Sequence, residues 1–127
     1  MLGYATMGTN DLERSAKFYD AIAEIAGAQR MFETDRVVTW GTPGKNAMIG
    51  VIKPLDGQPA TGGNGSMFGL PVDTEEKVRR IYDHALANGG SDEGHPGPRG
   101  EAFYAAYFRD PDGNKLVAFH RPDQSGE

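Results

Sequence analysis

The sequence predicts an α+β fold of two βαβββ modules, which form a curved mixed sheet with a concave ligand cavity. Three observations support this prediction: two segments with helical periodicity, short apolar runs around them, and an offset of 63 residues between the halves. At 127 residues the chain is long enough to bury one core but too short for a second full domain. We therefore predict a single domain.

The first helix is expected between Asn10 and Gly27. Asn10 can cap its N-terminus with Glu13 three residues later, and Gly27 supplies a left-handed C-terminal residue. Apolar residues recur at steps of three and four between these ends: Leu12, Ala16, Phe18, Tyr19, Ile22 and Ile25. This spacing places them on one face of a helix.

The second helix is expected between Asp73 and Gly90 and repeats this design. Asp73, Glu76 and Gly90 each stand 63 positions after their counterparts in the first helix. The apolar face consists of Val78, Ile81, Tyr82 and Leu86. Tyr82 itself stands 63 positions after Tyr19, so the chain contains an internal duplication.

Short extended runs precede and follow each helix. Strands are predicted at 3–9, 37–41 and 46–54 in the first half, and at 66–72, 102–108 and 115–120 in the second. We therefore divide the chain into module one (2–56), a linker (57–65), module two (66–121) and a flexible tail (122–127). With one helix per module on the same side of the sheet, the other side is free to bind a ligand.

The segment RDPDGNKLVAF, residues 109–119, has alternating polar residues that resemble a calcium loop. A calcium loop requires glycine at its sixth position and glutamate at its twelfth, but here Gly113 is fourth and Arg121 is twelfth. Pro111 and Gly113 instead favour a tight turn between two strands. We predict a hairpin turn that binds no ion.

Composition excludes several classes of function. Thirteen basic and eighteen acidic residues give a net charge of −5, which disfavours nucleic acid as a partner. The chain has no cysteine and no long apolar run, so we expect no disulfide, no membrane segment and a cytoplasmic location.

The duplicated pattern, with NDLERSAKFY opening the first helix and FRDPDGNKL near the end, resembles the vicinal oxygen chelate superfamily. This is the group of glyoxalases, bleomycin-resistance proteins and extradiol dioxygenases. The resemblance extends from Leu2 to about Arg121. It implies a homodimer, and an activity that ranges from isomerase, dioxygenase or epimerase to metal-free drug binding.

The resemblance also implies where metal-dependent members hold their ion. A histidine stands there seven residues before the Asp-Leu pair, a position that Tyr4 occupies here, and Met67 is its repeat mate. The last-strand carboxylate falls at Val117, and its counterpart in the first half at Met48, Ile49 or Gly50, depending on register. Magnesium, iron and zinc require imidazole or carboxylate ligands. Of these side chains only Tyr4 could ligate, so we expect no metal and no cofactor.

Two other arrangements of polar side chains would allow an enzymatic function. Glu101 and His95 could form a displaced metal site, or Tyr4 and Glu101 could act as an acid–base pair if they lie close together. The protein would then be a lyase resembling lactoylglutathione lyase, an isomerase or a dioxygenase. His84 is expected to be solvated or packed on a helix, and His120 to face away from Val117.

The leading interpretation is a metal-independent binding protein for a small, flat, partly apolar organic molecule. Arg99 could pair with a carboxylate or phosphate of the ligand. Tyr104 and Tyr107 are three residues apart in a strand, so one should face the cavity and the other the helix. The expected ligand-binding residues are Tyr4, Thr6, Trp40, Met67, Arg99, Tyr104, Val117 and Phe119. A scaffold domain whose cavity is filled by its own side chains is the remaining alternative.

Overall fold

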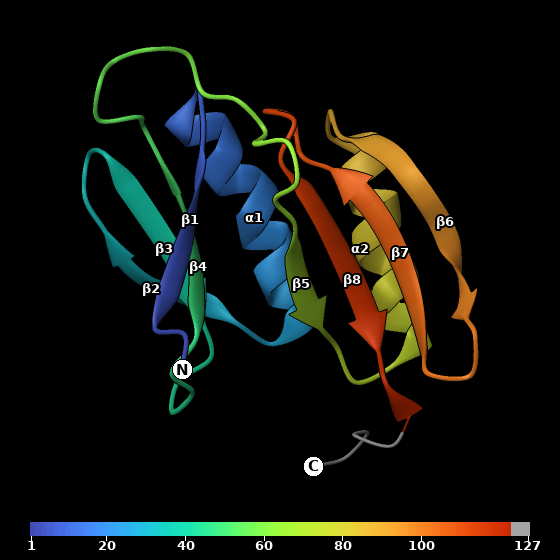
Figure 1. Ribbon diagram of the computed structural model, residues 1–127. Coiled ribbons are helices and arrows are strands. Elements are labelled where there is room, and N and C mark those ends of the chain that lie inside the picture. Colours follow the sequence, from blue (N-terminus) through green and yellow to red (C-terminus); the bar gives the residue numbers. More distant parts are fainter. Residues whose placement is uncertain (123–127) are drawn as a thin grey trace.

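The α+β class and the two βαβββ modules are confirmed by the computed structural model, which describes residues 1–122 (Figure 1). In chain order the elements are β1 (Tyr4–Gly8), α1 (Leu12–Ala26), β2 (Gln29–Glu33), β3 (Val37–Gly41), β4 (Met48–Ile52), β5 (Phe68–Pro71), α2 (Glu75–Ala87), β6 (Ser91–Arg99), β7 (Phe103–Arg109) and β8 (Lys115–His120). Among the described residues no helix has the length and apolar character needed to cross a membrane. Most of the predicted tail lies outside the described residues.

The strands form two separate four-stranded sheets rather than one continuous sheet. Their orders are β1-β4-β3-β2 and β5-β8-β7-β6, so both modules have the same topology. In each sheet the first and last strands of the module pair in parallel and the other neighbours are antiparallel. Figure 1 shows α1 between the two sheets and α2 behind the second sheet. The strands β1 and β5 are left as sheet edges.

Both helices begin one residue later than the sequence predicted. The N-caps are Asp11 and Thr74 rather than Asn10 and Asp73. The Asp11 carboxylate accepts a hydrogen bond from the backbone N–H of Arg14, and the Thr74 hydroxyl accepts one from Lys77. The offset of 63 residues still relates the two caps.

The helix C-termini differ between the modules. Gly27 is left-handed with φ = 80°, as predicted. The second helix ends at Ala87, and the left-handed glycine is Gly89 with φ = 93°, so the prediction that Gly90 performs this role was wrong. Gly90 is needed for another reason: a Cβ atom there would collide with the carbonyl oxygen of Arg109.

Six predicted strands are present with small shifts at their ends, but two strands escaped prediction. These are β2 and β6, and β6 includes His95 and Arg99. Prolines at 96 and 98 argued against a strand there. The strand is tolerated because β6 is a sheet edge, and its pairing with β7 shifts register twice.

The core lies between the sheets and the two helices, which contact each other. The aromatic residues Phe18, Tyr19 and Trp40 of module one belong to the same buried cluster as Val78 and Ile81 of α2. A shared core makes the modules one folding unit. At the contact, the His84 Nε2 atom lies 3.0 Å from the carbonyl oxygen of Phe18. His84 therefore packs on a helix, one of the two roles expected of it.

The segment between β7 and β8 forms the predicted hairpin turn. Gly113 is left-handed, with φ = 90°, and its N–H donates to the carbonyl of Asp110. The Asp110 carboxylate accepts from the backbone N–H groups of Asp112 and Asn114, both at 2.9 Å. Asp110, the first of the polar residues that resemble calcium ligands, therefore satisfies the backbone of its own turn.

The same turn also binds the start of α1 in module one. The Asp112 carboxylate accepts from the Thr9 hydroxyl at 2.7 Å and from the Asn10 backbone N–H at 2.9 Å, and it pairs with Arg14 at 2.9 Å. Only 1% of the Asp112 side chain is exposed. Buried charge-assisted hydrogen bonds of this kind fix the orientation of the two modules.

A second, buried contact joins the modules beside the first. The Tyr19 hydroxyl donates to Asp110 at 2.7 Å, and the Asn114 side-chain amide donates to the Gly8 carbonyl at 2.9 Å. Burial, together with the neighbouring Asp110, raises the pKa of Tyr19 well above its usual value. The hairpin turn is thus a structural connection between the modules.

Candidate functional site

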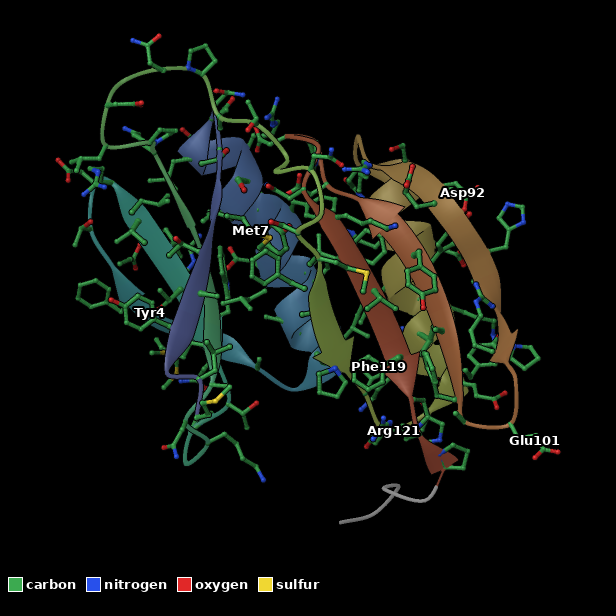
Figure 2. All side chains as sticks on the ribbon, in the orientation of Figure 1. Tyr4, Met7, Asp92, Glu101, Phe119 and Arg121 are labelled. Carbon is green, nitrogen blue, oxygen red and sulfur yellow. The ribbon has the colours of Figure 1, made fainter. Side chains whose placement is uncertain are left out.

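The face of each sheet opposite its helix, which we call the open face, carries most of the residues expected to bind ligand. On β1 the side chains alternate: Tyr4 is 65% exposed, whereas Met7 is 3% exposed. Figure 2 shows Tyr4 pointing away from α1 and Met7 pointing toward it. Thr6 shares the orientation of Tyr4, so both lie on the open face of module one.

The strand register identifies the fourth position equivalent to the superfamily's metal ligands. In module two Gly69 is paired with Val117, and in module one Thr6, the repeat mate of Gly69, is paired with Gly50. The counterpart of Val117 is therefore Gly50 rather than Met48 or Ile49. Four equivalent positions on the open faces thus hold Tyr4, Gly50, Met67 and Val117.

These four residues do not fit a hard divalent cation. Gly50 has no side chain, and Val117 and Met67 offer no oxygen or imidazole nitrogen. A Cβ atom added to Gly50 would lie 2.9 Å from both Thr39 Cγ2 and the Val38 carbonyl oxygen, so a carboxylate there has no room. Across residues 1–122 no group of three histidine or acidic side chains is placed to hold a metal ion. The side chains at these four positions therefore cannot supply the ligands that a divalent metal ion needs.

The open face of module two carries an apolar surface along β5, β7 and β8. Val117 is buried, Phe119 is half-buried, and the Phe119 ring meets Phe103 edge to face with centroids 6.0 Å apart. Met67, just before β5, is 48% exposed. Met67, Val117 and Phe119 thus lie on one face, as predicted.

Within one chain the two open faces do not converge. In Figure 2 Tyr4 points away from the second module, and Phe119 lies on β8 on the other side of α1. The helix α1 separates the edge strands β1 and β5. Each chain therefore presents two half-sites rather than one closed cavity.

Neither the displaced metal site nor the acid–base pair is formed. Figure 2 places Tyr4 and Glu101 at opposite sides of the molecule, so the expected acid–base pair does not exist within one chain. Glu101 lies in the turn between β6 and β7. The exposed His95 has its Nε2 atom 3.6 Å from an Asp92 carboxylate oxygen, and the described part of the chain adds no third ligand.

Trp40 is not on the open face, which corrects the sequence-based assignment. It points toward α1, is 3% exposed, and packs on Tyr19 with ring centroids 5.5 Å apart. Its Nε1 atom donates to Asp20 at 2.9 Å. Alternation along β3 places Val38 and Trp40 on the helix side and Thr39 on the open face.

Tyr104 is also on the helix side, so the choice between the two tyrosines of β7 was wrong. Its hydroxyl accepts from Arg79 of α2 at 3.2 Å. Tyr107 is paired with Val117 and shares the open face. His120 is paired with Tyr104, and its Nδ1 atom lies 3.1 Å from the Val72 carbonyl oxygen, so it faces away from Val117 as expected.

Arg99 lies on the open face together with Tyr107, the alternative to Tyr104, and with Lys115, which the sequence reasoning missed. Its guanidinium lies 5.4 Å from the ring centroid of Tyr107, and the Lys115 ammonium lies 5.8 Å from the same centroid. Alternation from Val117 could have identified Lys115, which is two residues earlier on the same strand. Tyr107 required the register between β7 and β8, which the sequence does not provide.

A cavity of about 780 Å³ lies on the helix side, between α1, the first sheet and β5. Its walls include Tyr19, Ile22, Ala26, Trp40, Phe68 and Leu70. The polar atoms of Tyr19 and Trp40 are already bonded to Asp110 and Asp20. The cavity walls therefore offer mainly apolar contacts. The cavity lies between the edge strands β1 and β5, which also border the two half-sites.

Comparisons with known proteins agree with this fold. A crystal structure of a glyoxalase/bleomycin resistance protein from Albidiferax ferrireducens T118 shares 40% identity, with a TM-score of 0.87, over 96% of this chain and 99% of that one. A glyoxalase-related enzyme from Fulvimarina pelagi shares 21% identity, with a TM-score of 0.74, over 96% and 88%. A lactoylglutathione lyase from Agrobacterium tumefaciens shares 16% identity, with a TM-score of 0.66, over 98% and 96%. The last two show likeness of fold alone.

Among curated proteins no match was found. The family model of the glyoxalase, bleomycin resistance protein and dioxygenase type matches residues 1–118, which is most of the chain. With the duplicated βαβββ topology and the relative at 40% identity, this match is decisive. The chain belongs to the Glyoxalase/Bleomycin resistance protein/Dioxygenase superfamily.

Proposed function

We propose that this protein is a metal-independent binding protein for a small, flat, partly apolar organic molecule. Binding takes place on the open faces and needs no catalytic metal. The ligand contacts the aromatic and aliphatic side chains of the two half-sites, among them Tyr4, Met67, Val117 and Phe119. Such walls suit a planar ring, because aromatic and thioether groups provide large apolar contact areas.

One observation carries this proposal: the replacement of the chelating positions by Gly50, Val117 and Met67. A single lost ligand could be compensated by water. Here Gly50 also lies against Thr39, so that the neighbouring side chain occupies the space a ligand would need. The apolar character of the remaining positions favours contact with an organic ring over contact with an ion.

We further propose that the protein is a homodimer in which β1 of one copy lies beside β5 of its partner. Both are edge strands, and large apolar side chains near them are exposed: Leu2, Tyr4 and Met67. Exposed apolar edges favour association. A two-fold axis makes this contact twice, because each copy supplies one β1 edge and one β5 edge.

This arrangement would complete the site. It would bring the open face of module one, with Tyr4 and Thr6, next to the partner's open face of module two. The dimer would therefore hold two equivalent sites, each built from both copies. The same contact would shield the apolar cavity on the helix side, which opens between the same edges.

A thermal-shift screen of flat aromatic compounds, with a chelator present throughout, tests the binding function. A ligand that binds only the native state raises the melting temperature, and it should do so equally with and without chelator. We expect Phe119→Ala to reduce the shift strongly. Leu86→Ala is the matched control, because Leu86 is exposed on α2, which covers the other face of the second sheet.

Two outcomes would contradict the proposal. A shift that chelator abolishes would show that a metal participates. A shift that Leu86→Ala and Phe119→Ala reduce equally would place the ligand elsewhere or reflect a general loss of stability.

A further inference from the structure

We propose that the ligand carries an anionic group, a carboxylate or phosphate, beside its flat apolar part, and that Arg99, Tyr107 and Lys115 bind this group. The inference rests on the proposed function, because it describes the chemistry of the same open face. It follows from the arrangement of these three side chains rather than from the apolar walls.

The three residues come from adjacent strands of the second sheet. Tyr107 is on the central strand β7, Arg99 at the end of β6 and Lys115 at the start of β8. The Arg99 guanidinium carbon is 5.4 Å and the Lys115 ammonium nitrogen 5.8 Å from the centroid of the Tyr107 ring. Both cations are therefore within cation–π range of the same phenol ring.

Hydrogen-bond donors of all three side chains are free to contact a ligand. Arg99 uses three of its five N–H groups on the carbonyls of His95, Gly97 and Pro98, which leaves two. Among the described residues, neither the Lys115 ammonium nor the Tyr107 hydroxyl has a hydrogen-bond partner. An oxyanion near the phenol can accept from each of them.

Among the described residues, the charges at this position have no counter-ion. Glu93 on the neighbouring strand β6 pairs instead with Arg109, at 3.6 Å. Within residues 1–122 neither Arg99 nor Lys115 forms an ion pair, although the chain as a whole has a net charge of −5. Two cations held against one ring repel each other, and a bound anion would remove that repulsion.

The neighbours of this cationic site define the rest of the ligand. Tyr107 is directly opposite Val117 on β8, and Phe119 and Phe103 follow along the same face. An anion at Tyr107 therefore has its organic part on an apolar wall. This combination selects aromatic or short-chain organic acids and phosphate esters over neutral ring compounds.

Three probes with the same ring system test the inference on the full-length protein: 2-naphthoate, 2-naphthyl phosphate and neutral 2-naphthol. We expect both anions to bind at least roughly tenfold more tightly than naphthol at low ionic strength, as charge-assisted hydrogen bonds predict. Added salt should weaken the binding of the anions only. The preference between the two anions identifies whether a carboxylate or a phosphate fits better.

The variant Lys115→Met keeps the length of the side chain and removes its charge. It should weaken the anions roughly tenfold and leave naphthol unchanged. Lys53→Met is the matched control, because Lys53 follows β4 in module one and is exposed. Tyr107→Phe keeps the ring and removes the hydroxyl, and it should weaken the anions by a smaller factor.

Different failures have different meanings. Equal affinity for all three probes would overturn the inference but leave the proposed binding function intact. Anion binding that neither Lys115→Met nor Tyr107→Phe changes would overturn the assignment of these residues. If no probe binds, naphthol included, both the inference and binding at the open face are contradicted.

Discussion

The two modules are alike on their helix faces and unlike on their open faces. On the helix faces, Tyr19 and its repeat mate Tyr82 both donate a hydrogen bond to an aspartate, at 2.7 and 2.9 Å. On the open faces, module one carries the uncharged Tyr4 and Thr6, whereas module two carries Arg99 and Lys115. The duplication has preserved what packs the helix and changed what meets solvent.

Even the shared tyrosines differ in one respect. The partner of Tyr82 is Asp92, on β6 of its own module, but the partner of Tyr19 is Asp110, in the other module. The first bond stabilises a helix on its sheet. The second joins two modules, and it is buried, so its loss should be felt by the whole molecule.

The largest expected effect is the destabilisation caused by Asp110→Ala. It removes the acceptor of the Tyr19 hydroxyl, the Asn114 amide and two backbone N–H groups, all in a buried position. We expect the free energy of unfolding to fall by about 4 kcal/mol, and by clearly less for the exposed counterpart Asp92→Ala. Denaturant titration of both variants measures the difference. Equal losses would show that the connection between modules is not special.

A smaller loss is expected for Asp112→Ala, which breaks the contact with Thr9, Asn10 and Arg14. We expect about 2 kcal/mol, because the carboxylate is buried but its partners are near solvent. The two modules should also unfold less cooperatively. Hydrogen exchange in β1 and α1 should therefore accelerate relative to β7. Arg14→Ala, which leaves the other two bonds intact, is the control. A uniform increase in exchange would argue against a role in joining modules.

Met67→Glu tests the association of two copies of the chain rather than the stability of one copy. Met67 is half-exposed in one chain, so the charge should cost the fold well under 1 kcal/mol, but it would lie at the proposed β1–β5 contact. We expect the variant to sediment as a monomer where the wild type sediments as a dimer. Lys53→Glu also adds a negative charge and should leave the dimer intact. A wild-type monomer, or a dimeric variant, would contradict the proposed contact.

A further prediction concerns the loss of stability at alkaline pH. Burial and the hydrogen bond to Asp92 raise the pKa of Tyr82 to about 12, from 10.0 in the unfolded chain. The protonated phenol therefore stabilises the fold at every pH below 10, and this contribution disappears as the pH rises from 10 to 12. Unfolding at a series of pH values should show a shallower decline in Tyr82→Phe than in the wild type. Parallel curves would mean that Tyr82 does not titrate with folding.

The duplication could be predicted because it depends on local chemistry. Helix periodicity, glycine ends and apolar runs located both helices and six strands. The strand β6 escaped because prolines at 96 and 98 argue against a strand, and only its position at a sheet edge makes them acceptable. The caps moved by one residue because Asp11 and Thr74 compete with Asn10 and Asp73 for the same position.

The candidate site was less predictable because it depends on register and orientation. Alternation along the strand from Val117 correctly placed Phe119 on the open face and His120 on the helix side. Trp40 was assigned to the wrong face because the orientation of β3 depends on its pairing with β2 and β4, which the sequence does not provide. Gly50 could be identified only from the pairing with Thr6, and the separation of Tyr4 from Glu101 only from the way α1 divides the two sheets.

The central claim is that the open faces bind organic molecules without a metal. Elemental analysis of untagged protein, after dialysis against nickel, manganese, zinc and iron(II), tests it most directly. With Gly50, Met67 and Val117 at the chelating positions, we predict no stoichiometric metal in any sample. One tightly held ion per chain would contradict the claim and would require ligands other than these.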